Sequence, residues 1–214
     1  MRILDLFCGA GGAAMGYHRA FPDAEITGVD INPQPNYPFT FVQGDAITYW
    51  LDGFDLIHAS PPCQDHSSLK TMHGGHGTAW MLQWMLEFLQ AKRGLWVVEN
   101  VGGADMGGSF VTLCGSSFGL GVRRHRQFAA SFPLMAPPCA HYLQPEPLDV
   151  TGTGGATPNR TRSGGGVSRK PRNLAHAREA MGIDWMTRRE LSQAIPPAYT
   201  EYIGRQLAAQ LVQQ

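Results

Sequence analysis

The sequence predicts an α/β fold in which a mostly parallel, doubly wound sheet carries one binding crevice. Two observations support this prediction. Short apolar runs end beside glycine, aspartate or cysteine, and amphipathic helical segments follow or separate them. In open sheets of this kind, ligands bind outside the carboxyl ends of the strands. The residues that follow the predicted strands are therefore the first candidates for a functional site.

The length and composition are those of a globular protein. At 214 residues, of which 43% are hydrophobic, the chain can form one domain with a substantial core, or a domain with a small appendage. Its apolar runs are shorter than a membrane span, and the start MRILDLFCGAGG is typical of a strand and a glycine turn, so we expect a cytoplasmic protein. The cysteines at 8, 63, 114 and 139 lack paired spacing. We therefore expect neither a disulfide framework nor a CxxC zinc site, and we predict no metal.

The net charge is zero, but the charges are unevenly distributed along the chain. Residues 1–120 contain 5 basic and 11 acidic side chains, a net charge of −6, whereas residues 121–214 contain 12 basic and 6 acidic ones, a net charge of +6. The basic part is the candidate phosphate-facing surface, with a solvated loop as the alternative. Its densest group, which no acidic residue interrupts, is Arg160, Arg162, Arg169, Lys170 and Arg172.

The first predicted strand covers residues 2–7 and leads into a glycine turn and a helix that opens at residues 13–15. Gly9, Gly11 and Gly12 would let a ligand approach the backbone at a helix N-terminus, as nucleotide-type cofactors require. The same glycines fit the dinucleotide fingerprint. The turn therefore predicts a cofactor but leaves NAD and S-adenosylmethionine open.

Two further strands are predicted at residues 25–29 and 39–42, and an aspartate follows each of them. Asp30 could accept hydrogen bonds from ribose hydroxyls, and the neighbouring Ile31 could cover an adenine face. Asp45 places a second carboxylate at a strand end. A single aspartate of this kind is more often a turn residue or a helix cap, but successive strand ends that share the pattern favour a cofactor site.

A fourth predicted strand, at residues 55–59, stops before Pro61 and Pro62, which cannot donate to a sheet ladder. Cys63 is thereby presented on a stiff turn beyond the strand, with a buried free cysteine as the alternative. The polar, glycine-rich loop 65–78 follows and would close over a substrate. Three histidines of this loop match no common zinc spacing with Cys63 and are not predicted to bind metal: His66, His73 and His76.

The rest of the chain predicts a helix at residues 78–92, strands at 95–98, 110–114 and 128–132, and a last amphipathic helix built on Tyr199, Ile203, Leu207 and Leu211. Another helix should begin at Thr187, which can form a capping box with Glu190. Glu99 directly follows the strand at 95–98. A carboxylate buried there without a partner would be costly, so we expect Glu99 to be functional or salt-bridged.

A series of segments links these predictions to one known family. They are DLFCGAGG at 5–12, Asp30, Gly44-Asp45, PPCQ at 61–64, ENV at 99–101, RxRxF at 124–128, PRNLAHAREAMG at 171–182 and AIPPAYTEYIGRQL at 194–207. In this order they resemble the motif series of DNA cytosine-5 methyltransferases. The chain departs from that series where Gly121-Val122 replaces a Pro-Gln pair and Gln193-Ala194-Ile195 replaces Gly-Asn. The short recognition segment resembles that of a minimal, phage-like or orphan member.

The resemblance implies a Rossmann-like, S-adenosylmethionine-dependent methyltransferase fold and methyl transfer to carbon 5 of cytosine in DNA. Cys63 would add to carbon 6 of the base, and Glu99 would hold or protonate ring nitrogen 3. Arg126 would fix the carbonyl oxygen of the base, and Arg124 would also contribute to the site. The residues expected to contact the cofactor are Phe7, Gly9, Gly11, Gly12, Asp30, Ile31, Asp45, Ala46 and Pro61.

The same resemblance implies double-stranded DNA as the partner and a target base that is flipped out of the helix. The catalytic domain would comprise residues 1–128 and a returning segment at 171–214. Residues 129–170 would form an irregular recognition platform, with a disordered insert as the alternative. The residues expected to contact DNA are Gln64, Ser67, Arg160, Arg162, Arg169, Lys170 and Arg172.

Several alternatives stay open. The same chemistry could act on RNA, as in the tRNA-acting branch of the family, and the glycine turn alone would suit an NAD-binding oxidoreductase. A non-catalytic DNA-binding relative is disfavoured because Cys63, Glu99 and Arg126 are all present. We expect a bacterial or phage-encoded protein in the host cytoplasm, as a monomer or weak dimer. Whether a partner restriction enzyme completes a restriction-modification system is an open question.

Overall fold

The computed structural model describes residues 1–62, 79–151, 161–162, 166–167 and 169–212, and it confirms the predicted α/β fold class. A seven-stranded sheet has the strand order β3-β2-β1-β4-β5-β7-β6. Strands β1 to β5 pair in parallel where they are neighbours, whereas β7 runs antiparallel to both β5 and β6. The carboxyl ends of the five parallel strands therefore meet at one edge, where open α/β sheets bind ligands.

The strands lie close to the apolar runs of the sequence. Their bounds are β1 (Arg2–Leu6), β2 (Glu25–Asp30), β3 (Thr40–Gln43), β4 (Leu56–Ala59), β5 (Leu95–Val101), β6 (Val111–Leu113) and β7 (Arg126–Ala130). Two predicted boundaries are wrong, because β5 continues past residue 98 and β7 begins before residue 128. The two strands pair from Val97 opposite Ala130 to Val101 opposite Arg126. Glu99 therefore lies within a strand.

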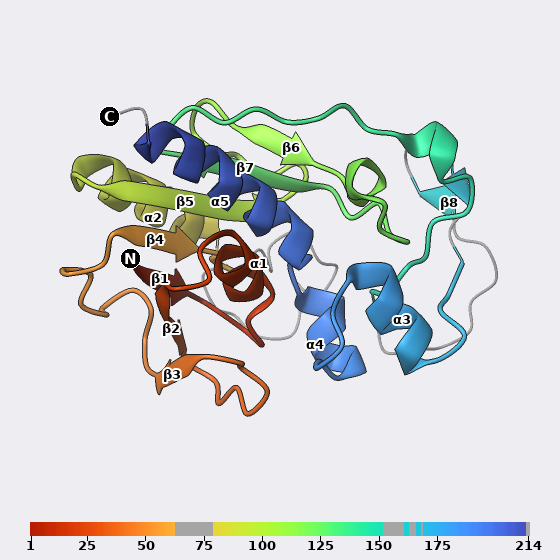
Figure 1. Cartoon of the computed structure of the whole chain (residues 1–214), viewed down its shortest axis with the longest axis horizontal. Helices are drawn as coiled ribbons and strands as arrows, with labels where there is room; N and C mark the ends of the chain where they lie inside the picture. Colours follow the sequence, from red (N-terminus) through yellow and green to blue (C-terminus); the bar gives the residue numbers. More distant parts are fainter. Residues whose placement is uncertain (63–78, 152–160, 163–165, 168, 213–214) are drawn as a thin grey trace.

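Helices cover both faces of the sheet (Figure 1). One face carries α1 (Gly12–Ala20) and α5 (Pro197–Leu211), and the other carries α2 (Ala79–Ala91). Successive residues of β1 point to opposite faces of the sheet and pack against different helices. Leu4 packs in the apolar cluster that includes α2, and Ile3 packs in the cluster that includes α1 and α5. Each large apolar side chain buried in this way contributes roughly 1.5–3 kcal/mol.

The α1 and α5 helices pack backbone to backbone, although they come from opposite ends of the described chain (Figure 1). A Cβ added at Gly16 would lie 2.0 Å from Thr200 Oγ1 and 2.2 Å from the Pro197 carbonyl oxygen, so only glycine fits there. Thr200 Oγ1 donates to the carbonyl of Ala13 at 2.8 Å. The predicted last amphipathic helix is thus confirmed, and it lies beside the helix that follows β1.

The remaining elements lie beyond the parallel strand ends. They are α3 (Leu174–Met181), α4 (Arg188–Gln193), the short 3-10 helices η2 (Gly115–Phe118) and η3 (His141–Leu143), and the two-stranded β8 (Thr161–Arg162) and β9 (Gly166–Val167). The predicted capping box of α4 is confirmed, since Thr187 Oγ1 accepts from Glu190 N while Glu190 Oε2 accepts from Thr187 N. Within the described part of the chain, no helix is long and apolar enough to cross a membrane.

Candidate active site

The turn after β1 is held in an uncommon backbone conformation. Phe7, which is not a glycine, has a φ of 57°, and Gly9 and Gly11 follow with φ of 49° and 82°. A non-glycine residue at such an angle costs on the order of 1–3 kcal/mol, and such strain clusters at functional sites. The turn is fixed to the neighbouring strand by a hydrogen bond from Cys8 N to the Val29 carbonyl, at 3.1 Å.

Asp30, at the end of β2, orients the same turn through its carboxylate. Its Oδ2 accepts from Gly9 N at 3.1 Å, and its Oδ1 accepts from Asn32 N at 2.9 Å. A carboxylate has about four acceptor sites, so both oxygens keep capacity for a ligand hydroxyl. Ile31 beside it is 67% exposed and presents its apolar side chain to solvent. The pair thus presents an acceptor and an apolar surface next to the turn.

The three glycines of the turn do not share one role. No described atom lies within 4 Å of a Cβ added at Gly9, so the space beside that residue is open. A Cβ at Gly11 would meet Pro38 Cδ at 2.7 Å, and one at Gly12 would meet the Ile195 carbonyl oxygen at 2.3 Å. Gly9 is therefore the residue where a ligand can approach the backbone, while Gly11 and Gly12 are required by packing within the protein.

The end of β3 lies next to this region. Gly44 N donates to the Asp30 carbonyl at 3.0 Å, which brings the two strand ends together. Asp45 is exposed and accepts from Ile47 N at 2.9 Å, whereas Ala46 is buried. The Asp45 side chain therefore stabilises a turn and is still exposed, so it remains compatible with the predicted cofactor contact.

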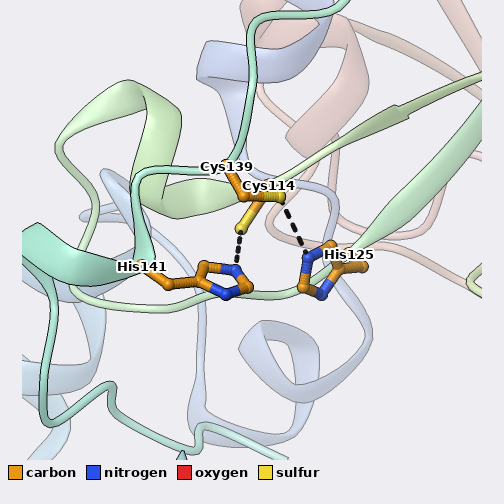
Figure 2. Close-up of side chains that lie close together, drawn as sticks. All are labelled: Cys114, His125, Cys139 and His141. Carbon is orange, nitrogen blue, oxygen red and sulfur yellow. Dashed lines mark hydrogen bonds between the residues drawn. The ribbon is translucent and has the colours of Figure 1, made fainter. Parts of the chain in front are cut away.

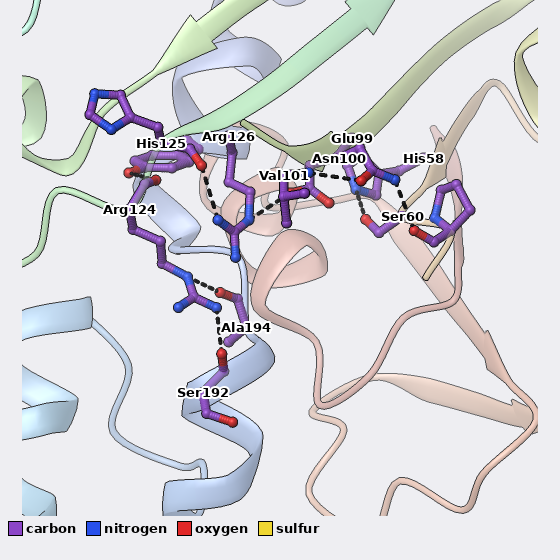
Figure 3. A network of polar contacts seen from close by, with 12 residues as sticks. His58, Ser60, Glu99, Asn100, Val101, Arg124, His125, Arg126, Ser192 and Ala194 are labelled. Atoms are coloured by element: carbon purple, nitrogen blue, oxygen red, sulfur yellow. Dashed lines mark hydrogen bonds and ion pairs between the residues drawn. The ribbon is translucent and has the colours of Figure 1, made fainter. Parts of the chain in front are cut away.

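Glu99 and Arg126 form a buried ion pair at the other half of this edge (Figure 3). Arg126 Nε lies 2.9 Å from Glu99 Oε1, and the side chains are diagonal neighbours across β5 and β7. Among the described residues, no donor makes a hydrogen bond of good geometry to that oxygen. Burial raises the pKa of Glu99, and Arg126, Arg124 and a hydrogen bond with Ser60 lower it by less, so the net shift is upward.

A chain of polar contacts leads from the core to Glu99 (Figure 3). Tyr17 Oη lies 3.0 Å from His58 Nδ1. His58 Nε2 lies 2.8 Å from Ser60 Oγ, and Figure 3 shows these two side chains beside Glu99. Burial lowers the pKa of His58 to about 3, so the ring is neutral. If Tyr17 donates to Nδ1, Nε2–H donates to Ser60 and leaves the hydroxyl of Ser60 free to donate to Glu99. This tautomer is inferred from the contacts.

Asn100 anchors the chain that leads toward the predicted nucleophile. Its Nδ2 donates to the Pro61 carbonyl at 3.0 Å, and its Oδ1 accepts from Val101 N at 2.9 Å. The buried Pro61 therefore has a fixed place beside β5, one residue before Pro62. Cys63 itself lies outside the described residues.

Arg124 is placed differently from Arg126. Its φ is 38°, and its guanidinium turns to the C-terminal segment, where Nε donates to the Ala194 carbonyl at 2.7 Å and Nη2 to that of Ser192 at 2.9 Å (Figure 3). Burial and the charge of Arg126 lower the pKa of Arg124 to about 9, so it stays charged at neutral pH. The sequence grouped the two arginines, but in the structure Arg126 contacts Glu99 and Arg124 connects two segments.

The predicted DNA contacts are only partly described. Arg169 Nη2 forms an ion pair with Glu146, and Lys170 Nζ lies 3.2 Å from Asp149 Oδ2, so nearby acidic residues accompany both cations. Arg172 is exposed. The structure does not describe the side chains of the other proposed contacts or of the loop histidines: Gln64, Ser67, Arg160, Arg162, His66, His73 and His76.

Sequence reasoning missed several residues of the site. Tyr17, His58, Ser60 and Asn100 all support Glu99 or Pro61, yet none was predicted to do so. A histidine inside the apolar run of β4 was the available signal, because a buried imidazole needs hydrogen-bond partners. The partners themselves come from α1 and from β5, and only the fold brings them together.

Known proteins resemble this chain in sequence and in fold. Residues 1–105 match the family model described as C-5 cytosine-specific DNA methylase. A search of curated proteins found no match to the sequence.

Among solved structures, a methyltransferase from Entamoeba histolytica is 11% identical over 99% of this chain and 98% of that chain, with a TM-score of 0.59. The plantazolicin methyltransferase BpumL in complex with SAH is 15% identical, with a TM-score of 0.33; the match covers 47% of this chain and only 39% of that one. An RNA methyltransferase from Salinibacter ruber is 14% identical over 63% and 82% of the two chains, with a TM-score of 0.37. The chain therefore has the Rossmann-like fold of methyltransferases, and nearly half of it is similar to cytosine-5 DNA methylases.

Proposed function

We propose that this protein transfers a methyl group from S-adenosylmethionine to carbon 5 of cytosine in DNA. The observation that carries the proposal is the buried Glu99–Arg126 pair at the ligand-binding edge of a methyltransferase fold, next to the strand end that leads to Cys63. The family match over residues 1–105 supports the same conclusion independently. It includes Glu99 but not Arg126.

The strand ends β1 to β3 fit the proposed cofactor. The backbone at Gly9 faces open space, Asp30 keeps acceptor capacity for ribose hydroxyls, and the exposed Ile31 can cover an adenine ring. Phe7, Asp45, Ala46 and Pro61 are the further proposed contacts. The bound cofactor would supply an electrophilic methyl group on a sulfonium. The protein would hold it so that the methyl group faces the base near Cys63.

Cys63, Glu99 and Arg126 would each have a separate role in the reaction. Carbon 5 of cytosine is a poor nucleophile, so the Cys63 thiolate first forms a bond to carbon 6, and the displaced electron pair makes carbon 5 nucleophilic. Glu99, whose pKa is raised, stabilises that charge by donating a proton or hydrogen bond to ring nitrogen 3. Arg126 donates to the carbonyl oxygen of the base. Carbon 5 would then form a bond to the methyl group as the bond from that group to the sulfonium sulfur breaks, which leaves S-adenosylhomocysteine. The proton of carbon 5 is then lost to a base, and the bond between carbon 6 and the Cys63 sulfur breaks to restore the ring and the thiolate.

A base inside a duplex cannot reach such a site, so the proposal includes base flipping. We propose that residues 129–170 supply recognition between a catalytic domain at 1–128 and a returning segment at 171–214, with the loop 65–78 closing on the flipped base. The exposed Arg172 and the side chains of Arg160 and Arg162 would contact phosphates.

The direct test is methyl transfer from labelled S-adenosylmethionine to duplex DNA and, in parallel, to RNA, followed by nucleoside mass spectrometry. We expect 5-methylcytosine in DNA, absent with Cys63→Ser, while calorimetry shows that the variant still binds S-adenosylmethionine and not NAD. A substrate with 5-fluorocytosine should trap a covalent adduct, because fluorine cannot leave carbon 5 as a proton does. Methylation of RNA alone would assign the chemistry to the other nucleic acid, and NAD binding would contradict the proposal.

A further inference from the structure

Two cysteines and two histidines converge where β6 ends and β7 begins (Figure 2). The cluster consists of Cys114, His125, Cys139 and His141, and its four ligand atoms all lie within 4.8 Å of one another. Cys114 directly follows β6, His125 directly precedes β7, and the other two lie in or beside η3. The sequence predicted no metal because the cysteines lack paired spacing. The fold brings these four residues together from separate segments of the sequence.

Two sulfur–nitrogen distances in the cluster are close to those of a tetrahedral zinc site. Cys114 Sγ lies 3.3 Å from His141 Nε2, and Cys139 Sγ lies 3.5 Å from His125 Nε2. Zinc bonds of about 2.3 Å to sulfur and about 2.0–2.1 Å to nitrogen, at tetrahedral angles, give sulfur–nitrogen separations of roughly 3.6 Å. Two isolated thiol–imidazole hydrogen bonds would explain each pair alone. They would not explain why both pairs face one common centre.

The surrounding contacts hold the ligands in place. Ser116 Oγ lies 3.1 Å from Cys114 Sγ and accepts from Ala140 N at 3.1 Å, so it joins the two cysteine-bearing segments. Ser117 Oγ donates to the Pro138 carbonyl at 2.8 Å, directly before Cys139. Such outer contacts orient metal ligands in known sites and raise metal affinity.

We propose that Cys114, His125, Cys139 and His141 bind one Zn²⁺ ion as a structural site. Two thiolates and two imidazoles are a donor set that zinc prefers, and four protein ligands leave no position for substrate, which is the arrangement of structural rather than catalytic zinc. The proposal does not depend on the proposed methyl transfer.

The position of the cluster indicates what the metal does. His125 stands between Arg124 and Arg126, so a metal bound there fixes the start of β7 and thereby Arg126, the partner of Glu99. The same ion ties the segment that carries Cys139 and His141 to the edge of the sheet. Zinc therefore positions one arginine of the active site and the chain that leads into residues 144–170.

The test is the metal content of the full chain, purified under reducing conditions without a histidine tag. We expect about one equivalent of zinc by mass spectrometry, and replacement by Co²⁺ should give the visible absorption of a tetrahedral site with sulfur-to-cobalt charge transfer. Cys139→Ser and His141→Gln should lose the metal and melt at a lower temperature. Cys8→Ala and His176→Gln, which remove a thiol and an imidazole of described residues outside the cluster, should keep it.

Three results would overturn the proposal. The reduced wild-type protein could contain no zinc and give no cobalt spectrum, a measurement that does not depend on whether any variant folds. Cys139→Ser could retain a full equivalent of metal; because Cys139 is exposed, that substitution leaves the core intact. A disulfide between Cys114 and Cys139 in protein isolated without oxidant would assign the cluster to redox chemistry instead.

Discussion

Arg126 Nε lies 2.9 Å from Glu99 Oε1 on one face of the antiparallel β5–β7 pair. The exposed fractions of the two side chains are only 15% and 8%. A buried ion pair is weak evidence for stability, because desolvation of the charges offsets much of their attraction. Its location near the edge where open α/β sheets bind ligands is consistent with the proposed chemical role.

Glu99→Gln should reduce kcat by about 100-fold or more, because the amide keeps the shape of the carboxyl but cannot exchange a proton. Burial raises the pKa of Glu99, so its protonated form persists above the ordinary carboxyl range, and wild-type activity should fall as pH rises through the raised pKa. Single-turnover methyl transfer across pH should show this basic limb in the wild type and not in the variant. Full activity of Glu99→Gln would exclude the carboxyl from the chemistry.

Arginine-to-lysine substitutions should separate the roles of Arg124 and Arg126. Arg126→Lys keeps a positive charge beside Glu99 but loses the planar donor group, so we expect a large loss of kcat and a nearly unchanged melting temperature. Arg124→Lys loses contacts to the Ala194 and Ser192 carbonyls, worth about 1.5–3 kcal/mol, so its main effect should be on stability. Kinetics and thermal melting of both variants provide the comparison. The opposite pattern would return Arg124 to the catalytic group.

Because His58 is buried, the free energy of unfolding should decrease at acidic pH. Its folded-state pKa is lowered to about 3, so between that value and the unfolded pKa the unfolded chain binds the extra proton. The contribution of His58 to the free energy of unfolding is fully present above the unfolded pKa of histidine. It falls by about 1.4 kcal/mol for each pH unit below that pKa. Denaturant unfolding at several pH values should show a shallower slope for His58→Gln. Tyr17→Phe, which keeps the imidazole, should retain the slope while losing about 1 kcal/mol.

Gly16→Ala should destabilise the protein by about 3 kcal/mol or more, since the added methyl group meets backbone and hydroxyl atoms of α5 that cannot move independently. That change corresponds to a fall in melting temperature of roughly 6–12 °C for a chain of this length. Gly108→Ala is the matched control, because no described atom lies within 4 Å of its added Cβ. Equal melting temperatures for the two variants would show that the helices can separate at little cost.

Replacing Arg160 and Arg162 together by alanine should weaken DNA binding at low salt. If both contact phosphate, the slope of log binding constant against log salt should become shallower by roughly 1.8, since each phosphate contact contributes about 0.9. Arg205→Ala, whose side chain forms an ion pair with Glu201 on α5, should leave the slope unchanged. Fluorescence anisotropy across a salt series measures both. An unaltered slope in the double variant would show that this segment does not meet DNA backbone.

The sequence predicted the central sheet well because strands buried on both faces appear as continuous apolar runs. The predicted bounds were less accurate for β5 and β7, the strands that contain the charged residues Glu99 and Arg126. The hydrophobic pattern ended β5 at residue 98, since nothing in it reveals that Arg126 would lie diagonally across from Glu99 on β7 and pair with it. The direction of the Arg124 side chain depends on a left-handed backbone angle, which the sequence does not show.

The candidate site could be predicted where its residues lie at strand ends. Asp30 and Asp45 were found in this way, since Asp30 ends β2 and Asp45 lies two residues after β3. Glu99 was noticed because the predicted strand ended at residue 98, although the structure places it within β5. The residues that support them, such as His58 and Asn100, act through partners on other strands and could not be found from spacing. The role of Cys63 stays a prediction.

The close contact of α1 with α5 has a consequence for biosynthesis. Gly12 rests against the Ile195 carbonyl and Gly16 against Thr200, so the turn after β1 acquires its final packing only after residues near position 200 have left the ribosomal exit tunnel. A polypeptide that stalls before residue 200 therefore lacks the contacts that hold α1 and the turn before it in place.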